Sequence, residues 1–445
     1  MRLDLKACER ALTADDLVTG GRITRVNGST IEALLPRAQT GSIYRIAGQG
    51  GRGGLLSEVI GFRESETILA PFGEPRGISA GDLVEPEGLT DEQRVSDHFL
   101  GRIVDPLGHP LDGGPPIEGR HVLPLYRPAP NPLIRTPIHE QFLTGVSVID
   151  SMATFGRGQR VGIFAGAGVG KSTLMGMLAR HSQSEVNVIA LVGERGREVR
   201  TFIEQELGPE GLARSVLIVA TGDAAPILRV RAAFLATTMA EYFRERGRQV
   251  LLMMDSLTRL AHALREIGLA AGEPPTTRGY PPSVFSTLPK LLERAGNSSG
   301  QGTMTALYTV LVDGDDLNDP VADASRSILD GHVVLSRKVA ESGRYPAVDV
   351  LGSLSRVASE LISPTHALVA ARVREVLSGY DEVRDLIQVG AYREGTDPRV
   401  DRVVQLYPRV TDFFRQKRPE KRPLEATLGG LEALLGTEIH AKAKA

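Results

Sequence analysis

A glycine-rich segment at residues 165–173 constrains the fold of this chain more than any other feature. The apolar run Arg160–Phe164 leads into the sequence AGAGVGKST, and a helix is expected from Ser172 onward. In such a strand–loop–helix, glycines let backbone N–H groups turn inward around phosphate oxygens, and the helix start adds partial positive charge. The sequence therefore predicts a P-loop on a parallel α/β sheet. The residues expected to bind nucleotide there are Gly166, Ala167, Gly168, Val169, Gly170, Lys171, Ser172 and Thr173.

Two side chains of this segment have predicted roles in handling Mg²⁺ and ATP. Lys171 supplies a full positive charge for the β- and γ-phosphates, and Ser172 supplies a hydroxyl ligand for Mg²⁺. The usual pattern starts with glycine, whereas this chain has Ala165 at that least demanding position. The alternative interpretation is a glycine-rich turn with a surface lysine, which the strand–loop–helix context disfavours. We therefore expect ATP and Mg²⁺ as cofactors.

Two further apolar runs end in a carboxylate. Asp255 follows Val250–Met254, and Glu194 closely follows Val188–Val192. Ligands bind at the carboxyl ends of strands in open α/β sheets, so Asp255 is the candidate partner of Mg²⁺ and Glu194 the candidate group that polarises the attacking water. Arg195 is a candidate phosphate contact. The alternatives are a solvated strand end for Asp255 and an exposed ion-pair cluster around Arg195.

The rest of the chain divides into segments that differ in hydrophobic pattern and in proline content. Residues 20 to about 90 contain short alternating runs separated by turns, which predict a small barrel or sandwich. Residues 105–140 are proline-rich and predict an extended connector that wraps a surface. Strand-like and helix-like stretches alternate over residues 145–355, as in a parallel sheet covered on both faces. From about residue 362 the pattern is helical, with separate helices expected at 367–378, 383–389, 400–414 and 424–435.

Composition narrows the possible compartments and partners. The formal net charge is −2, which argues weakly against binding nucleic acid along the chain. The single cysteine, Cys8, cannot form an internal disulfide. No apolar stretch has the length of a signal peptide core or a membrane span. We therefore expect a cytoplasmic protein whose membrane contact is peripheral.

Three motifs together resemble a known family. AGAGVGKST, GERGREV at residues 193–199 and LLMMDSLTR at residues 251–259 resemble the catalytic core shared by F-type and V-type rotary ATPases and type III export ATPases. The similarity covers roughly residues 20 to 415. Residues 272–296 and the sequence QVGAYREGTD at 388–397 are similar to the export branch. VDGDDLNDPVAD at 312–323 favours its flagellar form over the virulence injectisome form.

The resemblance implies a fold and a division into domains. The expected fold is a RecA-like P-loop NTPase core with a parallel sheet, preceded by a small N-terminal β-barrel and followed by a C-terminal helical domain. The expected boundaries are 1–18 for an N-terminal regulatory helix, 19–92 for the barrel, 93–360 for the ATP-binding domain and 361–445 for the helical domain. Residues 1–18 have a helical apolar face, although a frayed terminus is the alternative.

The resemblance also assigns residues that the pattern alone would not. Arg356 matches the arginine finger, which stabilises charge on the transferred phosphoryl group of a neighbouring subunit. Tyr345 matches the aromatic residue that stacks on adenine, and Arg259 matches a position beside the phosphate site. Without the resemblance, Arg356 would be a surface arginine and Tyr345 a core aromatic residue with a solvated hydroxyl.

The implied protein is an ATPase that works as a homohexamer and powers flagellar or type III protein export, by releasing chaperone–cargo complexes and energising the export gate. Its implied partners are a stator-like regulator, a central stalk protein, the export gate membrane protein and export chaperone–cargo complexes, without nucleic acid. It would associate peripherally with the inner membrane at the export apparatus.

Four other functions stay open at this point. The chain could be the catalytic subunit of an F-type or V-type rotary ATPase, or a virulence injectisome ATPase. It could also be an RNA-translocating hexamer or a nucleotide-binding ring subunit without catalysis. Residues 272–296 argue against the first, the near-neutral charge argues against RNA translocation, and the presence of Glu194 argues against a non-catalytic subunit.

Overall fold

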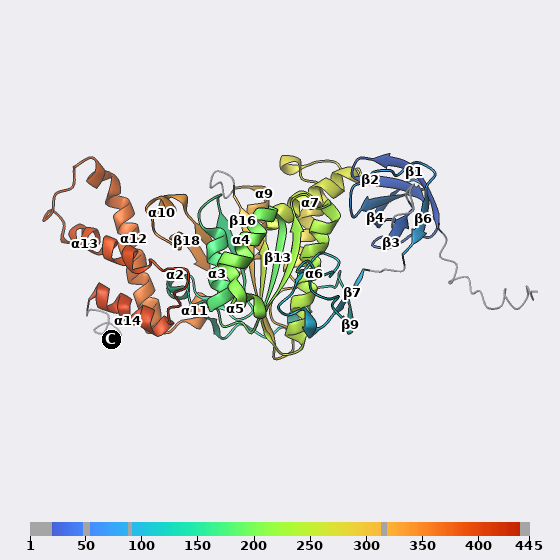
Figure 1. Cartoon of the computed structure of the whole chain (residues 1–445). Coiled ribbons are helices and arrows are strands. Elements are labelled where there is room, and N and C mark those ends of the chain that lie inside the picture. Colours follow the sequence, from blue (N-terminus) through green and yellow to red (C-terminus); the bar gives the residue numbers. More distant parts are fainter. Residues whose placement is uncertain (1–19, 48–53, 88–90, 313–317, 437–445) are drawn as a thin grey trace, which may run out of the picture.

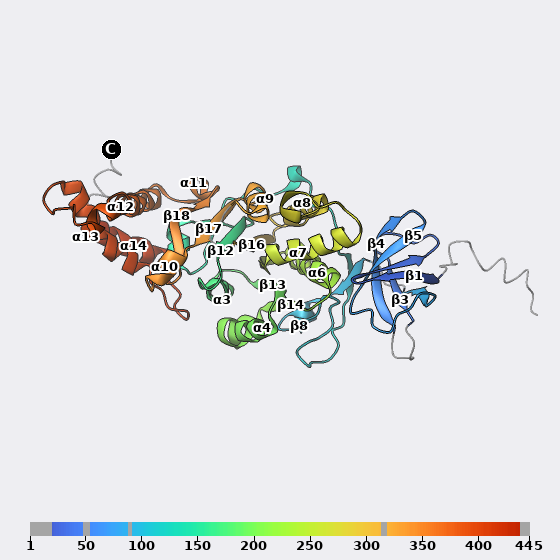
Figure 2. The ribbon, with the colours of Figure 1, turned by 90° about the horizontal axis from the view of Figure 1, so that it is seen from above.

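The chain forms three regions arranged in a row. The computed structural model describes residues 20–47, 54–87, 91–312 and 318–436. A β-barrel lies at one end, a large sheet with its helices lies in the middle, and a group of helices lies at the other end, as both views show (Figures 1 and 2). The predicted N-terminal helix at residues 1–18 lies outside the described residues.

The first region is a closed six-stranded barrel. Its strand order is β1-β2-β5-β4-β3-β6. The side chains of Ile31, Ile46, Val59, Leu69 and Val84 are fully buried at its centre. The strands are β1 (Gly21–Asn27), β2 (Thr30–Leu34), β3 (Ile43–Ile46), β4 (Leu55–Arg63), β5 (Glu66–Pro71) and β6 (Leu83–Pro86).

A buried polar contact joins the barrel to the middle region. Glu58 of β4 accepts a hydrogen bond from the Tyr126 hydroxyl at 3.3 Å and lies 3.9 Å from the guanidinium of Arg231. Arg231 belongs to helix α6 (Pro226–Glu245), and both charged side chains are almost fully buried. Burial raises the pKa of Glu58 to about 7, although Arg231 opposes this rise. The joint therefore contains a carboxyl group that titrates near neutral pH.

The segment between the barrel and the P-loop strand contributes short strands, of which only β9 lies in the proline-rich connector. β7 (Glu92–Val95) pairs with β9 (His121–Pro124) as a two-stranded ribbon. Between them, β8 (Ile103–Val104) pairs with β14 and forms one edge of the large sheet. The sequence analysis did not predict this edge strand, which lies just before the expected connector, because two residues are too few to show a period.

The large sheet has eight strands in the order β18-β17-β12-β16-β15-β13-β14-β8. The pairings from β17 to β8 are parallel, and only β17 and β18 are antiparallel. The remaining strands of this sheet are β12 (Arg160–Ala165), β13 (Val186–Glu194), β14 (Ser215–Thr221), β15 (Gln249–Asp255), β16 (Thr303–Leu311), β17 (Gly331–Leu335) and β18 (Val348–Ser355).

Helices cover both faces of the sheet. On the central strand β13, Val188 and Ala190 contribute to one core, whereas Ile189 and Leu191 contribute to another on the opposite face. The first core includes α6, α7 (Leu257–Ala270), α8 (Pro282–Leu292) and α9 (Pro320–Ile328); the second includes α2 (Ser147–Met152) and α3 (Lys171–His181). Shorter elements are β10 (Gln141–Phe142), β11 (Phe155–Gly156), α4 (Gly196–Thr201), η3 (Phe202–Leu207), α5 (Gly208–Ala213), α10 (Arg337–Glu341), α11 (Ala358–Leu361), η1 (Asp97–Phe99), η2 (Pro132–Ile134) and η4 (Thr277–Gly279).

Three helices form the last region: α12 (Pro364–Gln388), α13 (Pro398–Phe413) and α14 (Leu424–Leu435). The helices expected at 367–378 and 383–389 are one continuous helix, α12. A Cβ atom on Gly379 would lie 3.2 Å from the side chain of Val403. The glycine therefore lets α13 pack closely on α12, and this packing outweighs its poor helix propensity. Among the described helices, none combines the length and the apolar character that a membrane span requires.

Candidate active site

The glycine-rich segment forms a loop between β12 and α3, as predicted. Gly168 and Gly170 have φ angles of 79° and 91°, in the left-handed region that favours glycine. Val169 between them is buried in the core and anchors the loop. α3 begins at Lys171, directly after Gly170, so the unpaired N–H groups of its first turn lie at the loop. The backbone is therefore arranged to receive an anion.

Three predicted side chains meet beside this loop. The Nζ atom of Lys171 lies 2.5 Å from Oδ1 of Asp255 and 3.4 Å from Oε1 of Glu194. The exposed fractions of the three side chains are 12 %, 5 % and 11 %. They come together because β12, β13 and β15 are parallel, so their carboxyl ends lie at one edge of the sheet. One buried positive charge thus faces two carboxyl groups.

The surroundings of Glu194 favour its protonated form. Burial and the neighbouring Asp255 carboxylate raise the pKa of Glu194 to about 7, against the opposing effect of Lys171. A group with a pKa near the working pH is well suited to accept a proton from water. Gly193 has a φ angle of 74°, and a Cβ atom there would lie 2.8 Å from Cβ of Arg259. Arg259 therefore packs directly on the backbone that carries Glu194.

Thr309 is a member of the site that the sequence analysis missed. Its hydroxyl donates a hydrogen bond to Oδ1 of Asp255 at 2.7 Å, and its side chain is fully buried. It lies in β16, next to β15, where Met254 pairs with Tyr308. A threonine within an apolar strand carries no signal in the sequence. Only the strand order shows that it is beside Asp255.

The donor set fits a magnesium ion. Ser172 is exposed on the first turn of α3, and Asp255 contributes a carboxylate. A hydroxyl and a carboxylate are hard oxygen ligands, and Mg²⁺ commonly uses one or two of these together with water and substrate phosphates. The described part of the chain holds no group of three or more His, Cys, Asp or Glu side chains suited to a metal. The protein ligands are thus few, which agrees with a magnesium site whose remaining ligands are phosphates of the substrate and water.

A cavity of about 880 Å³ opens beside the loop and is lined by Gly168, Gly170, Thr173 and Tyr345. A Cβ atom on Gly170 would lie 3.4 Å from the Tyr345 ring, which is partly exposed. The cavity is also lined by residues 415–420 and 422. They belong to the segment 415–422 between α13 and α14, which we name the strap. The backbone N–H of Gln416 in the strap donates to the Tyr345 carbonyl at 2.9 Å. The cavity has the place and size for a nucleoside next to bound phosphates.

Two predicted arginines lie outside the Lys171 cluster. Arg195 is 80 % exposed and pairs with Glu198 at 3.0 Å, the arrangement that the ion-pair alternative described. Arg356, just after β18, is exposed and donates a hydrogen bond to the Arg326 carbonyl at 3.2 Å. An exposed arginine near the edge of the sheet can reach a site on another chain.

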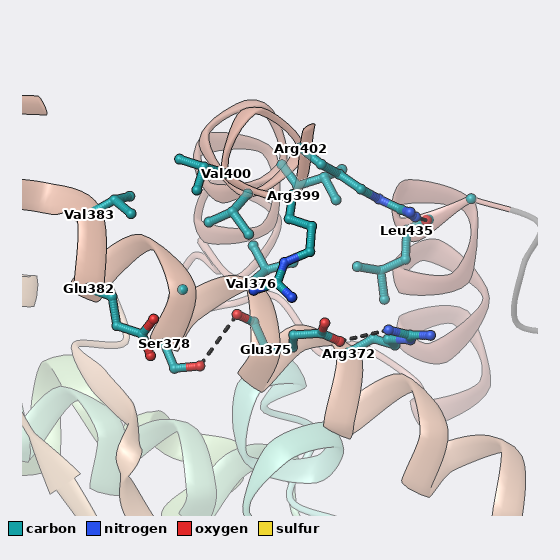
Figure 3. Close-up of a pocket in the computed structure, with 14 residues that line it drawn as sticks. Arg372, Glu375, Val376, Ser378, Glu382, Val383, Arg399, Val400, Arg402 and Leu435 are labelled. Carbon is teal, nitrogen blue, oxygen red and sulfur yellow. Dashed lines mark hydrogen bonds and ion pairs between the residues drawn. The ribbon is translucent and has the colours of Figure 1, made fainter. Parts of the chain in front are cut away.

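A second cavity lies among the C-terminal helices. It has a volume of about 390 Å³ between α12, α13 and α14. Figure 3 shows Val376, Val400 and Leu435 beside charged side chains, with Arg372 paired to Glu375 at 2.7 Å. None of the predicted catalytic residues lines it. We therefore place the candidate chemistry at the P-loop cavity.

Comparisons with known proteins agree with this geometry. Residues 145–355 match the model of the ATP synthase alpha/beta family nucleotide-binding domain, and residues 362–433 match the T3SS EscN ATPase C-terminal domain. A flagellum-specific ATP synthase of Bacillus subtilis is 49% identical over 94% of this chain and 95% of its own length. A type 3 secretion system ATPase of Xanthomonas euvesicatoria is 48% identical over 92% of each.

Solved structures give the same result for the fold. The structure of the assembled ATPase EscN from the enteropathogenic E. coli type III secretion system has a TM-score of 0.88 and 42% identity. It covers 94% of this chain and 100% of its own. EscN in complex with its central stalk EscO has a TM-score of 0.86 with the same identity and coverage. The expected order of barrel, P-loop sheet and helical region is thus confirmed.

Proposed function

Because the chain belongs to the family of flagellum-specific ATP synthases and type 3 secretion system ATPases, we propose a mechanism in which its P-loop cluster hydrolyses ATP at the interfaces of a homohexamer. The chain is an ATPase of ATP-driven type III export, and this function fits better than that of an F-type or V-type catalytic subunit. The observation that carries the mechanism is the position of Lys171 between Glu194 and Asp255 beside the loop.

Each residue of the cluster has a proposed part in hydrolysis. The N–H groups of residues 166–173 and the Lys171 ammonium bind the phosphates, so Lys171 exchanges a carboxylate partner for a phosphate. Ser172 and Asp255 would hold Mg²⁺, and the ion would supply positive charge against the phosphates. Glu194 orients a water molecule in line with the γ-phosphate and accepts its proton. Tyr345 stacks on adenine. Arg195 is exposed and paired with Glu198, away from the cluster. The contact that we propose for it is therefore one across a subunit interface.

The location of Arg356 supports a ring. The guanidinium is exposed in this chain, and a cluster without an arginine finger is incomplete for phosphoryl transfer. Identical chains in a closed ring can each offer Arg356 to a neighbour, as head-to-tail contacts allow. The assembled form of EscN supports this arrangement, and its complex with a central stalk supports a stalk protein as a partner here.

The wider setting is proposed from family membership. We infer partners of four kinds: a stator-like regulator, a central stalk protein, the export gate membrane protein and chaperone–cargo complexes. The protein would work in the cytoplasm against the inner membrane. We propose the flagellar system on the basis of residues 312–323. The flagellar relative is 49% and the secretion relative 48% identical to this chain, so the proposal depends on that segment.

A mixing experiment tests the shared site. Mg²⁺-dependent ATPase rate is measured against protein concentration for wild type, Glu194→Gln, Arg356→Ala, and an equal mixture of the two variants. We expect the wild-type specific rate to rise with concentration and each variant to lose on the order of 10²-fold or more. In the mixture, about a quarter of the interfaces combine an intact Glu194 with an intact Arg356, so about a quarter of the wild-type rate should return.

A second mixture serves as the control. Glu194→Gln combined with Lys171→Ala leaves every P-loop site defective, and no rate should return. If the Arg356→Ala mixture also stays inactive, Arg356 does not act across an interface. If Glu194→Gln hydrolyses ATP normally, the assignment of the catalytic base is wrong. Stimulation of the wild-type rate by RNA would instead revive an RNA-translocating hexamer.

A further inference from the structure

A buried carboxylate that hydrolysis does not use lies against the P-loop helix. Glu206 of η3 is 5 % exposed, and its Oε1 accepts a hydrogen bond from the Thr173 hydroxyl at 3.0 Å. Thr173 directly follows Ser172 and lines the nucleotide cavity. A Cβ atom on Gly176 would lie 2.6 Å from Cβ of Glu206, so η3 and α3 are in close contact. The carboxylate is therefore fixed next to the phosphate-binding turn.

One arginine of the strap reaches this carboxylate. The Arg418 guanidinium lies 3.1 Å from Oε1 of Glu206, and Arg418 also lines the cavity. The carbonyl of Arg418 accepts hydrogen bonds at 3.0 Å from Arg180 and from His181, both at the end of α3. The strap is thus joined to the end of the P-loop helix by two hydrogen bonds, and to its start through the Arg418–Glu206 ion pair and the Glu206–Thr173 hydrogen bond.

Two residues before Arg418, hydrogen bonds of the Gln416 side chain fix the strap to residues 145–147. The side chain of Gln416 accepts hydrogen bonds from the N–H of Ser147 at 2.9 Å and from its hydroxyl at 3.0 Å. Its amide donates to the Gly145 carbonyl at 2.7 Å. The position of Arg418 therefore depends on how α13 and α14, which flank the strap, are seated on α2 and α3.

Electrostatics gives this pair a consequence for nucleotide binding. The Glu206 carboxylate is bonded to Thr173, the residue after Ser172, and a carboxylate there repels a polyphosphate. Burial strengthens that repulsion because little water screens it. The second oxygen of Glu206, Oε2, is buried without a hydrogen-bond partner. Its charge is therefore compensated mainly by Arg418, and removing one partner of such a pair leaves an uncompensated charge.

We propose that Glu206 and Arg418 form a charge pair that sets the affinity of the P-loop for nucleoside di- and triphosphates according to the position of the strap. With the pair formed, the carboxylate is neutralised and holds Thr173 in place, and the site retains nucleotide. A displacement of α13 and α14 that removes Arg418 exposes the phosphates to an uncompensated carboxylate and favours release. Both are positioning residues, and this inference rests on the proposed nucleotide site.

A double-mutant cycle on the full chain tests the pair. The dissociation constant of Mg²⁺-ADP is measured by calorimetry for wild type, Arg418→Gln, Glu206→Gln and the double variant, with thermal unfolding of each. We expect Arg418→Gln to weaken binding about tenfold, a typical size for coupling between sites. Glu206→Gln should bind at least as tightly as wild type. The double variant should match Glu206→Gln, because there is no charge left to compensate.

Three further measurements separate charge from structure. Arg418→Lys keeps the charge and should retain most of the affinity. Arg200→Gln removes an exposed arginine paired with Glu204, two residues before Glu206, and should change nothing. Because the Glu206 carboxylate is buried, the defect of Arg418→Gln should persist as salt is raised. Equal weakening by Arg418→Gln in both backgrounds, or no weakening at all, overturns the charge pair. A wild-type chain that binds no nucleotide overturns the proposed function itself.

Discussion

Replacing Thr309 by valine should weaken the use of magnesium while the fold is kept. Valine fills the space that threonine occupies at this buried position of β16, so the loss is that of the hydroxyl and its hydrogen bonds. The substitution removes the hydrogen bond of 2.7 Å to Oδ1 of Asp255, which leaves Lys171 as the donor to that oxygen. Hydrogen bonds to charged groups contribute about 1.5–3 kcal/mol. The carboxylate is then free to follow Lys171 and loses the orientation that Mg²⁺ requires.

The size of the effect follows from that free energy. A loss of about 1.5–3 kcal/mol corresponds to a factor of about 10–150, in line with the 10–100-fold cost of losing a residue that orients a metal ligand. The assay is the ATPase rate as a function of Mg²⁺ concentration at saturating ATP. We expect the half-saturating Mg²⁺ concentration to rise by about tenfold or more, together with a smaller loss of maximal rate.

Thr305→Val on the same strand is the matched control. Thr305 is also fully buried, but its hydroxyl accepts a hydrogen bond from the Gly158 N–H at 3.0 Å and makes no contact with Asp255. This variant should lose stability, because it leaves a buried N–H unpaired, without any change in magnesium dependence. If Thr309→Val and Thr305→Val show the same magnesium dependence as wild type, Thr309 does not orient Asp255 and the argument is refuted.

Two other predictions concern the barrel joint and the backbone before Glu194. The folded pKa of Glu58, about 7, exceeds its ordinary value of 4.5, so the folded state binds more protons between these values and its stability falls as pH rises from about 4.5 to 7. Chemical denaturation should show that Glu58→Gln removes a pH-dependent loss of stability on the order of 3 kcal/mol. Identical slopes of stability against pH for both proteins would contradict this. Gly193→Ala should reduce kcat by about tenfold or more, because the new Cβ meets Arg259. Gly208→Ala has a similar φ angle of 66° but open space around it, so kcat should stay normal there.

The cluster that we propose to be catalytic could be predicted because its members share a simple topological rule. Lys171, Glu194 and Asp255 each follow an apolar run, and parallel strands bring such ends together. Thr309 obeys the same geometry, but a threonine in a strand is common and gives no signal. Asp255 and Thr309 become neighbours only when β15 and β16 pair, which the order of strands along the chain does not reveal.

Other parts of the site escaped prediction because they depend on long-range packing. The strap contacts Glu206 and Tyr345 from a distant part of the chain, and no local pattern encodes that contact. Gly379 suggested a helix break, because propensity is a weak guide where packing on Val403 decides. β8 was missed since its strand character comes from its partner β14. In each case the structure of the segment is decided by the element that packs against it, and not by the segment's own sequence.

The place of β12 in the sheet has a consequence for how the protein is made. The strand that carries the P-loop ends at residue 165, yet its two neighbours, β16 and β17, begin at residues 303 and 331. On the ribosome, the loop therefore emerges long before either flanking strand exists. A nascent or truncated chain that ends before β16 has a glycine-rich segment without a sheet to hold it. The ability to capture ATP is thus acquired late in synthesis, when most of the chain has left the exit tunnel.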